Sequence, residues 1–344
     1  MLYCVTDIGS NTVKMNIFDR SPDGSRRLVY AVSSTLGLAA KRIDGALTDR
    51  GTEQLAALLL KYKKDALAHG CDELHAFATA SLRNITNTEQ VRARILHKTD
   101  IYIDVLSGEE EAQLSFLGMK RDIAGESGIT VDLGGGSCEL IRFENREPVR
   151  SVSIPLGCVL LRDRFIRSGK YPNEEESAEI YRCVRSEADR CGIGTTHDGY
   201  LVGGSARALF RLASAESSAE SAKNYEKADF IEIGSERFPY RTGVNISCDG
   251  ILTREDFAGI CEKYSLAYRD TETALAVERT VPDRQTTAVP GMIALRAIAD
   301  SCSLSILRHC TSGVREGYLE RLIETESMLY RQRPELTQHA ETEN

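Results

Sequence analysis

Residues 3–18 read YCVTDIGSNTVKMNIF, and residues 129–143 read ITVDLGGGSCELIRF. In both stretches a strand-like run enters a short turn of aspartate and glycine, and a second strand-like run leaves it. When the stretches are superposed, Asp7 falls on Asp132, 125 positions later, and three further pairs match: Gly9 with Gly134, Thr12 with Ser137 and Phe18 with Phe143. Two hairpins of one kind, each opening one half of the chain, indicate a duplicated fold.

Strand-like and helix-like runs alternate along the rest of the chain, which is typical of an α/β layer architecture. We expect helices near 49–69, 87–97, from 107 onward, and near 156–167, 173–191, 205–213, 254–264, 290–309 and 314–330, with strands near 73–78, 101–105 and 199–202. Residues 214–229 are polar and of low complexity, so we expect an exposed helix end or loop there. Residues 214–250 resemble an insertion to which we assign no role.

Composition limits the class of protein. A chain of 344 residues with 42% hydrophobic and 27% charged residues fits a globular protein of two domains. No run reaches the roughly 18 apolar residues of a membrane span, and the start MLYCV is a β-run without a secretory signal. The ten cysteines are irregularly spaced. This spacing favours reduced thiols in the cytoplasm over disulfides or a zinc site.

Each hairpin turn places a carboxylate, Asp7 or Asp132, at the end of a buried strand. Glycines in the following bend allow close approach of a ligand, and successive backbone N–H groups form a nest for anions. A carboxylate repels phosphate but can hold a hydrated Mg²⁺ that bridges phosphate oxygens. A lone Asp–Gly turn is usually an ordinary hairpin. Two copies facing one cleft favour a binding site.

The stretch Ser107-Gly108-Glu109-Glu110-Glu111-Ala112 opens a predicted helix. Ser107 and Glu110 form a capping box, and Glu109 is favoured by the helix dipole, so both acids have structural explanations. No such structural role within the helix explains Glu111. It is either a surface glutamate or a base that orients and deprotonates water for attack on phosphorus.

Two further strand–helix junctions carry candidate phosphate ligands. Arg83 ends Thr79-Ala80-Ser81-Leu82-Arg83, and the planar guanidinium suits phosphate oxygens, although a surface arginine is the plainer interpretation. Gly203-Gly204-Ser205 precedes a helix and is a third candidate anion site.

Together these stretches resemble the exopolyphosphatase/guanosine pentaphosphate phosphatase family of the actin-like ATPase and sugar kinase superfamily. The matches run in order from residue 3 to about 320, through residues 5–12, 107–112, 131–140, 202–205, 289–291 and 312–317. The resemblance implies an α/β fold of two ribonuclease H-like (actin-like ATPase) domains, with mixed sheets flanked by helices and the active site in the interdomain cleft. We expect domains at 1–120 and 121–312, a C-terminal helix at 313–330 that packs back on the first domain, and a disordered tail at 331–344.

The resemblance also implies roles for single residues. Glu111 would be the general base, and Asp132 and Glu139, with Asp7, would hold Mg²⁺ or Mn²⁺. Phosphate would be bound by Asp7, Gly9, Ser10, Asn11, Thr12, Arg83, Gly134, Gly135, Gly136 and Ser137. The terminal phosphoryl group would lie between the two nests, and no phosphoenzyme is required.

Three functions stay open. The first is an exopolyphosphatase, acting on short chains because the printed sequence ends before the extra helical domain of longer family members could fit. The second is hydrolysis of guanosine pentaphosphate in the stringent response, and the third is a non-catalytic polyphosphate or alarmone sensor. A net charge of −8 argues against nucleic acid as the partner, and a polyanionic substrate would need local basic clusters. A homodimer is suggested by the family alone.

Overall fold

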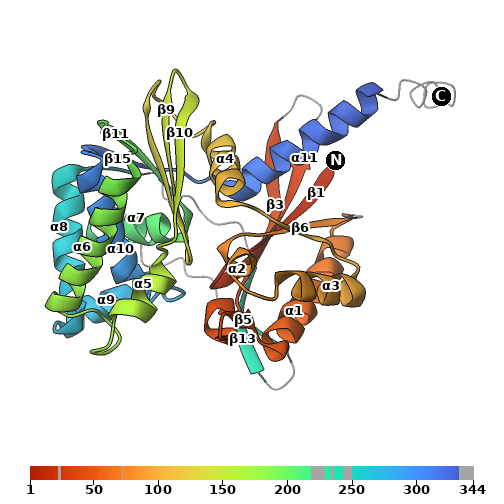
Figure 1. Cartoon of the computed structure of the whole chain (residues 1–344), viewed down its shortest axis with the longest axis horizontal. Helices are drawn as coiled ribbons and strands as arrows, with labels where there is room; N and C mark the ends of the chain where they lie inside the picture. The colour runs from red at the N-terminus through yellow and green to blue at the C-terminus, as the bar shows by residue number, and fades with distance from the viewer. Residues whose placement is uncertain (22–24, 72, 218–228, 234–235, 243–249, 333–344) are drawn as a thin grey trace.

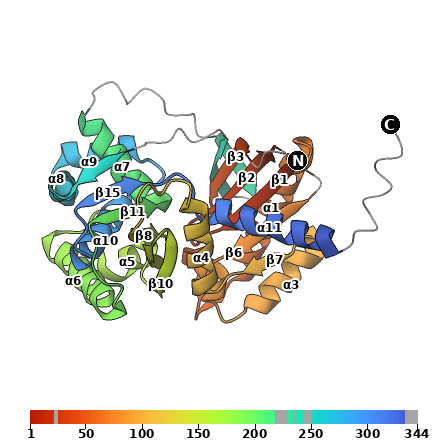
Figure 2. The same cartoon turned by 90° about the horizontal axis from the view of Figure 1, so that it is seen from above.

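The computed structural model describes residues 1–21, 25–71, 73–217, 229–233, 236–242 and 250–332. The chain folds into two α/β lobes, each built on one mixed sheet (Figure 1). Helix α4 (Gly108–Met119) lies between the lobes, and helix α11 (Val314–Gln332) runs across the first lobe beside it (Figure 2).

The first sheet has the strand order β12-β13-β3-β2-β1-β6-β7. Its strands are β1 (Leu2–Ile8), β2 (Thr12–Arg20), β3 (Arg26–Thr35), β6 (Leu74–Ala78), β7 (Ile103–Val105), β12 (Asp229–Ile233) and β13 (Glu236–Thr242). A separate small ladder joins β4 (Arg42–Ile43) to β5 (Ala46–Leu47). The helical segments of this lobe are η1 (Leu38–Lys41), α1 (Asp49–Ala68), α2 (Ala80–Arg83) and α3 (Thr88–Thr99).

The second sheet has the order β10-β9-β8-β11-β15-β14. Its strands are β8 (Gly128–Leu133), β9 (Cys138–Glu144), β10 (Glu147–Ile154), β11 (Asp198–Val202), β14 (Ile251–Thr253) and β15 (Ile306–His309). The helical segments around it are α5 (Cys158–Phe165), α6 (Glu174–Cys191), α7 (Gly203–Ser217), α8 (Arg254–Ser265), η3 (Leu266–Tyr268), α9 (Thr271–Thr280) and α10 (Ala288–Ser301). Among the described helices, none is both long and apolar enough to span a membrane.

The two sheets share one strand plan, as the repeated hairpins predict. In β3-β2-β1-β6-β7 and in β10-β9-β8-β11-β15, an antiparallel three-stranded meander is followed by two parallel strands. Asp7 and Asp132 are the second-last residues of the equivalent strands β1 and β8, so the repeat places the two aspartates at corresponding edges of the two sheets. The expected fold class, two mixed sheets flanked by helices, is confirmed.

Helices α4 and α11 cross at backbone contact. A Cβ atom on Gly118 would lie 1.9 Å from the carbonyl oxygen of Gly313, and one on Gly317 would lie 1.8 Å from that of Leu114. Farther along, α11 covers the first lobe, where the rings of Tyr318 and Phe77 stack at 4.7 Å between centroids. The residues that open these two helices are thereby fixed relative to each other.

One expected element is wrong. The sequence predicts a helix over 290–309, but α10 ends at Ser301, Ser303 has a left-handed φ of 55°, and residues 306–309 form strand β15. This apolar run resembles a helix end locally, and its strand conformation comes from pairing with β11, which is distant in sequence.

The expected insertion contains a hairpin. Strands β12 and β13 follow α7 of the second lobe, yet β13 pairs with β3 of the first sheet, with Tyr240 opposite Ser34. The predicted helix end is described as far as Ser217, and residues 218–228 lie outside the described residues. Of the disordered tail predicted at 331–344, the first two residues instead end helix α11, and residues 333–344 also lie outside the described residues.

Candidate active site

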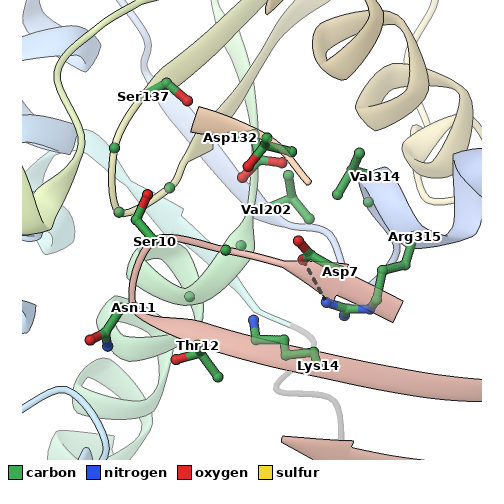
Figure 3. Close-up of a pocket in the computed structure, with 18 of the residues that line it drawn as sticks. Asp7, Ser10, Asn11, Thr12, Lys14, Asp132, Ser137, Val202, Val314 and Arg315 are labelled. Atoms are coloured by element: carbon green, nitrogen blue, oxygen red, sulfur yellow. Dashed lines mark hydrogen bonds and ion pairs between the residues drawn. The ribbon is translucent and has the colours of Figure 1, made fainter. Parts of the chain in front are cut away.

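A cavity of about 110 Å³ lies between the lobes and is lined by both hairpin turns and by the starts of α4, α7 and α11 (Figure 3). It brings together most of the predicted site residues, namely Asp7, Gly9, Ser10, Asn11, Thr12, Glu111, Asp132, Gly134, Gly135, Gly136, Ser137, Gly203 and Gly204. Three predicted residues, Arg83, Glu139 and Ser205, are absent from its described lining.

The two hairpin turns have the same hydrogen-bonding pattern. Gly9 N donates to Thr12 O at 3.1 Å, and Gly134 N donates to Ser137 O at 3.0 Å. Their bends are also in contact, because a Cβ atom on Gly136 would lie 2.8 Å from Ser10 Oγ.

The carbonyl groups of the turns are occupied. Those of Ser10 and Asn11 accept from the amides of Ala39 and Gly37, and those of Gly134 and Gly135 accept from the amides at the start of α5. Within the described part of the chain, the amides of four turn residues donate to no backbone oxygen: Ser10, Asn11, Gly135 and Gly136. Occupied carbonyls beside free N–H groups form an anion-binding nest, here present twice.

Asp7 and Asp132 are half-buried carboxylates of the cavity, and the loss of hydration there is the largest cause that raises the pKa of each. Oδ2 of Asp7 lies 3.4 Å from Nη1 of Arg315 on α11 (Figure 3). Oδ2 of Asp132 accepts a hydrogen bond from Ser115 Oγ at 2.9 Å. Their negative charges also raise the pKa of Glu111, so a cation in the cavity would relieve repulsion among three acids.

Glu111 is positioned by the capping box that starts α4. Ser107 Oγ accepts from Glu110 N, and Glu110 Oε2 accepts from Ser107 N, which confirms the duty predicted for Glu110. The next residue, Glu111, is only 8% exposed. Burial is the main reason that its pKa is raised to about 7, while Arg83 opposes the rise. A carboxylate with a pKa near neutrality is suited to accept a proton.

Arg83 lies behind Glu111. Its Nη1 donates to Glu111 Oε2 at 2.8 Å and to the carbonyl oxygen of Leu106 at 3.0 Å. The arrangement orients the glutamate, and direct binding of phosphate by Arg83 stays a prediction.

Glu139 and Ser205 are buried and are not part of the described lining of the cavity. Glu139 is 2% exposed and accepts a hydrogen bond from Ser153 Oγ at 2.9 Å. Burial first, and then the charges of Glu111 and Asp132, raise its pKa well above the usual range. The buried Ser205 hydroxyl has no hydrogen-bond partner within the described residues. Their roles in metal and phosphate binding stay predictions.

Four cations line the cavity that sequence reasoning missed: Lys14, Arg207, Arg284 and Arg315. Burial is the main cause that lowers the pKa of Lys14 to about 7 and that of Arg207 to about 10, and neighbouring arginines add to both shifts. Among the described residues, neither side chain has a hydrogen-bond or ion-pair partner. Half-buried cations without such partners create a positive field for an anionic ligand.

Weak signals for two of these cations are present in the sequence. Lys14 stands two positions after Thr12 in β2, on the same face of the strand. Arg207 stands one helical turn after Gly204 in α7. Arg284 and Arg315 come from segments whose approach to the turns is not encoded locally.

The acids of the cavity bear on whether it can hold a metal ion. No cluster of three or more histidine, cysteine, aspartate or glutamate side chains with metal-binding geometry occurs in the described ranges, so an all-protein cage is not formed there. Two half-buried aspartates beside an anion-binding nest do fit Mg²⁺, which uses one or two carboxylates, several waters and substrate phosphates.

A sequence model of the Ppx/GppA phosphatase family matches residues 22–326. The chain belongs to this family. Over 156 residues it is 36% identical to Exopolyphosphatase 1 of Mycobacterium tuberculosis, a match that covers 44% of this chain and 45% of that protein. It is 28% identical over 190 residues to the guanosine-5'-triphosphate,3'-diphosphate pyrophosphatase of Pseudoalteromonas atlantica, covering 55% of this chain and 37% of that protein. The matches thus span about half or less of these relatives.

Solved structures of the Ppx/GppA family share the whole fold. An exopolyphosphatase from Cytophaga hutchinsonii superposes with a TM-score of 0.77 at 18% identity, covering 94% of this chain and 98% of that one. The Aquifex aeolicus family member gives 0.73 at 20% identity, covering 95% and 98%. At such identities the likeness establishes the fold alone.

Proposed function

We propose that this chain hydrolyses the terminal phosphoanhydride bond of short inorganic polyphosphate with the help of a divalent cation. The observation that carries the proposal is one cavity between the lobes in which two turns with free amides, four acids and four cations meet. The family assignment and the relatives named exopolyphosphatase support the same reaction.

The cations answer the difficulty posed by a net charge of −8. Lys14, Arg207, Arg284 and Arg315 concentrate positive charge inside the cavity, where low dielectric strengthens attraction to phosphate. The free amides of the two turns add hydrogen-bond donors that stay in place during the reaction. Donors fixed in advance stabilise developing charge on the phosphoryl oxygens without reorganisation.

Asp7 and Asp132 are the residues that would hold Mg²⁺ or Mn²⁺, with Glu139 behind them. When bound, the ion would neutralise phosphate oxygens and orient the terminal phosphoryl group.

Glu111 would act on water. Its carboxylate would accept a proton as the water oxygen forms a bond to the terminal phosphorus, and the bridging P–O bond would break opposite the attacking water. The products are orthophosphate and a chain shorter by one phosphate. Arg83 would hold the base in place through the 2.8 Å contact.

The cavity size bears on the substrate. A volume of about 110 Å³ is well below the roughly 300–1,000 Å³ of pockets that enclose drug-sized ligands, so it would take phosphate groups and leave the remainder of a substrate outside. Guanosine pentaphosphate also presents a terminal phosphate and is the competing substrate, in line with the Pseudoalteromonas relative.

Phosphate release tests the proposal directly. Short polyphosphate, long polyphosphate and guanosine pentaphosphate would each be incubated with the purified chain, with Mg²⁺, with Mn²⁺ and with EDTA. We expect metal-dependent release that is fastest from short chains. Release from guanosine pentaphosphate alone would assign the second substrate, whereas binding of all three without release would favour a sensor.

Other features stay predictions: a cytoplasmic location, a homodimer, a link to the stringent response, and domain boundaries near residues 120 and 312. Two of these features can be measured on the purified chain: sedimentation would examine the homodimer, and limited proteolysis would examine the domain boundaries.

A further inference from the structure

Ser115 lies on α4 one helical turn after Glu111. Residues four apart in a helix share one face, so its hydroxyl and the proposed base point toward the same region. The side chain is only 2% exposed, and its Oγ donates to Oδ2 of Asp132 at 2.9 Å. One helix therefore carries the proposed base and contacts a carboxylate that would hold the metal ion.

The hydroxyl has a choice of acceptor. Met119 Sδ lies 3.9 Å from Ser115 Oγ, but a thioether is a weak acceptor, and a serine hydroxyl has a single proton to donate. Hydrogen bonds to ionised acceptors are roughly twice as strong as neutral ones. Ser115 therefore favours the ionised form of Asp132 and fixes the plane of its carboxylate.

The opposite side of Asp132 is confined as well. Gly203 has a φ of 89°, and a Cβ atom there would lie 2.6 Å from Asp132 Oδ1. One carboxylate oxygen thus lies against the backbone of the α7 start, and the other is held by Ser115. Rotation of the group is restricted on both sides.

Helix α4 itself cannot move freely. At Gly118 it contacts the loop before α11, and at Leu114 it contacts Gly317 of α11, both at backbone distance. Because the helix is fixed, the hydrogen bond from Ser115 also holds the Asp132 carboxylate in a fixed position. Glu111 is held in the same way, because it belongs to the first turn of this helix.

We infer that Ser115 is a positioning residue for the proposed hydrolysis, which sets the Asp132 carboxylate at a fixed separation from Glu111. The inference rests on the proposed function, since it assumes that Asp132 holds a divalent cation. Outer-shell partners that orient a metal-binding carboxylate usually contribute 10–100-fold to metal affinity or activity. Ser115 would contribute in this way without contacting substrate.

The test compares the wild-type chain of 344 residues with Ser115→Ala, Ser115→Thr and a control. Ser177→Ala is the control, because the Ser177 hydroxyl on α6 is buried without a hydrogen-bond partner in the described residues. Circular dichroism and urea midpoints establish that each variant is folded. Two quantities are then measured: Mn²⁺ affinity by electron paramagnetic resonance without substrate, and the Mg²⁺ concentration for half-maximal phosphate release.

We expect Ser115→Ala to weaken Mn²⁺ binding and to raise the Mg²⁺ requirement by about 10–100-fold. Ser115→Thr retains the hydroxyl and should recover most of this loss, and Ser177→Ala should match the wild type in both measurements. Unchanged Mn²⁺ affinity in a folded Ser115→Ala chain would overturn the inference.

The experiment distinguishes failure of the proposed hydrolysis from failure of the positioning role of Ser115. If the wild type released no phosphate, the proposed function would be wrong, while Mn²⁺ affinity would still decide the role of Ser115. If the wild type bound no Mn²⁺, the inference would be wrong even if phosphate were released. Should Ser115→Ala fail to fold, the comparison of Ser115→Cys with Ser115→Thr decides, because a thiol is a weak donor and only Thr should then bind Mn²⁺ normally.

Discussion

Oε2 of Glu111 lies 2.8 Å from Nη1 of Arg83, so the acid at the start of α4 is held by a cation from the end of α2. The guanidinium lowers the pKa of Glu111, while burial raises it more strongly, to about 7. Arg83 thus keeps a desolvated acid available in its ionised form at neutral pH.

Glu111→Gln should retain the fold and lose turnover. Glutamine has the shape of the protonated acid and can still accept from Arg83, but it cannot take a proton from water. We expect kcat for phosphate release to fall by about 10²–10⁴-fold. Glu109→Gln is the matched control, because Glu109 lies in the same first turn and is exposed. Near-normal turnover in Glu111→Gln would exclude Glu111 as the base.

Arg83→Gln should shift the pH profile in a defined direction. Because Arg83 lowers the pKa of Glu111, its removal leaves the raising effects of burial and of Asp132 unopposed. The base would then ionise at higher pH, and the ascending limb of kcat/KM would move to higher pH than in the wild type. Arg27→Gln is the control, because the side chain of Arg27 is exposed. Arg42→Gln would not serve, since Arg42 donates hydrogen bonds to backbone carbonyls of α2. An unmoved limb would mean that Arg83 does not act through Glu111.

The sequence could predict those parts of the site that are local in the chain. Both turns, their aspartates and the capping box that isolates Glu111 depend on neighbouring residues, and the structure brings them to one cavity. The cations were harder to find. Arg315 meets Asp7 only because the crossing of α4 and α11 carries the last helix back to the first strand.

The same limit explains the wrong helix end after residue 301 and a strand pairing that the sequence did not predict. Residues 306–309 are a strand through their pairing with β11, and β13 joins a sheet of the other lobe. Neither pairing partner is adjacent in sequence, so the residue periodicity within β15 or β13 could not predict which strand each would pair with.

Lys14→Arg should remove one limb of the pH profile. Burial lowers the pKa of the Lys14 amine to about 7, so the free enzyme loses this positive charge, which we propose to bind phosphate, as pH rises through 7. Glu111 gains its active, ionised form over the same range. We therefore expect a bell-shaped profile of kcat/KM with a maximum near pH 7.

An arginine at position 14 stays charged, so the descending limb should disappear while the ascending limb stays. Both enzymes would be measured on the same short polyphosphate, which makes any ionisation of the substrate common to the two profiles. Superimposable profiles would show that the Lys14 charge is not needed for binding.

Gly317→Ala should destabilise the fold where Gly259→Ala stabilises it. A methyl group at position 317 would lie 1.8 Å from the carbonyl oxygen of Leu114, and since backbone lies on both sides, α4 and α11 must separate. Overpacking of this kind costs about 1–3 kcal/mol or more. Gly259 lies exposed in α8 with nothing within 4 Å of the added Cβ, so the same change there should add up to about 1 kcal/mol through helix propensity. Urea unfolding would measure both, and equal midpoints for the two variants would mean that the helix crossing is looser than these distances require.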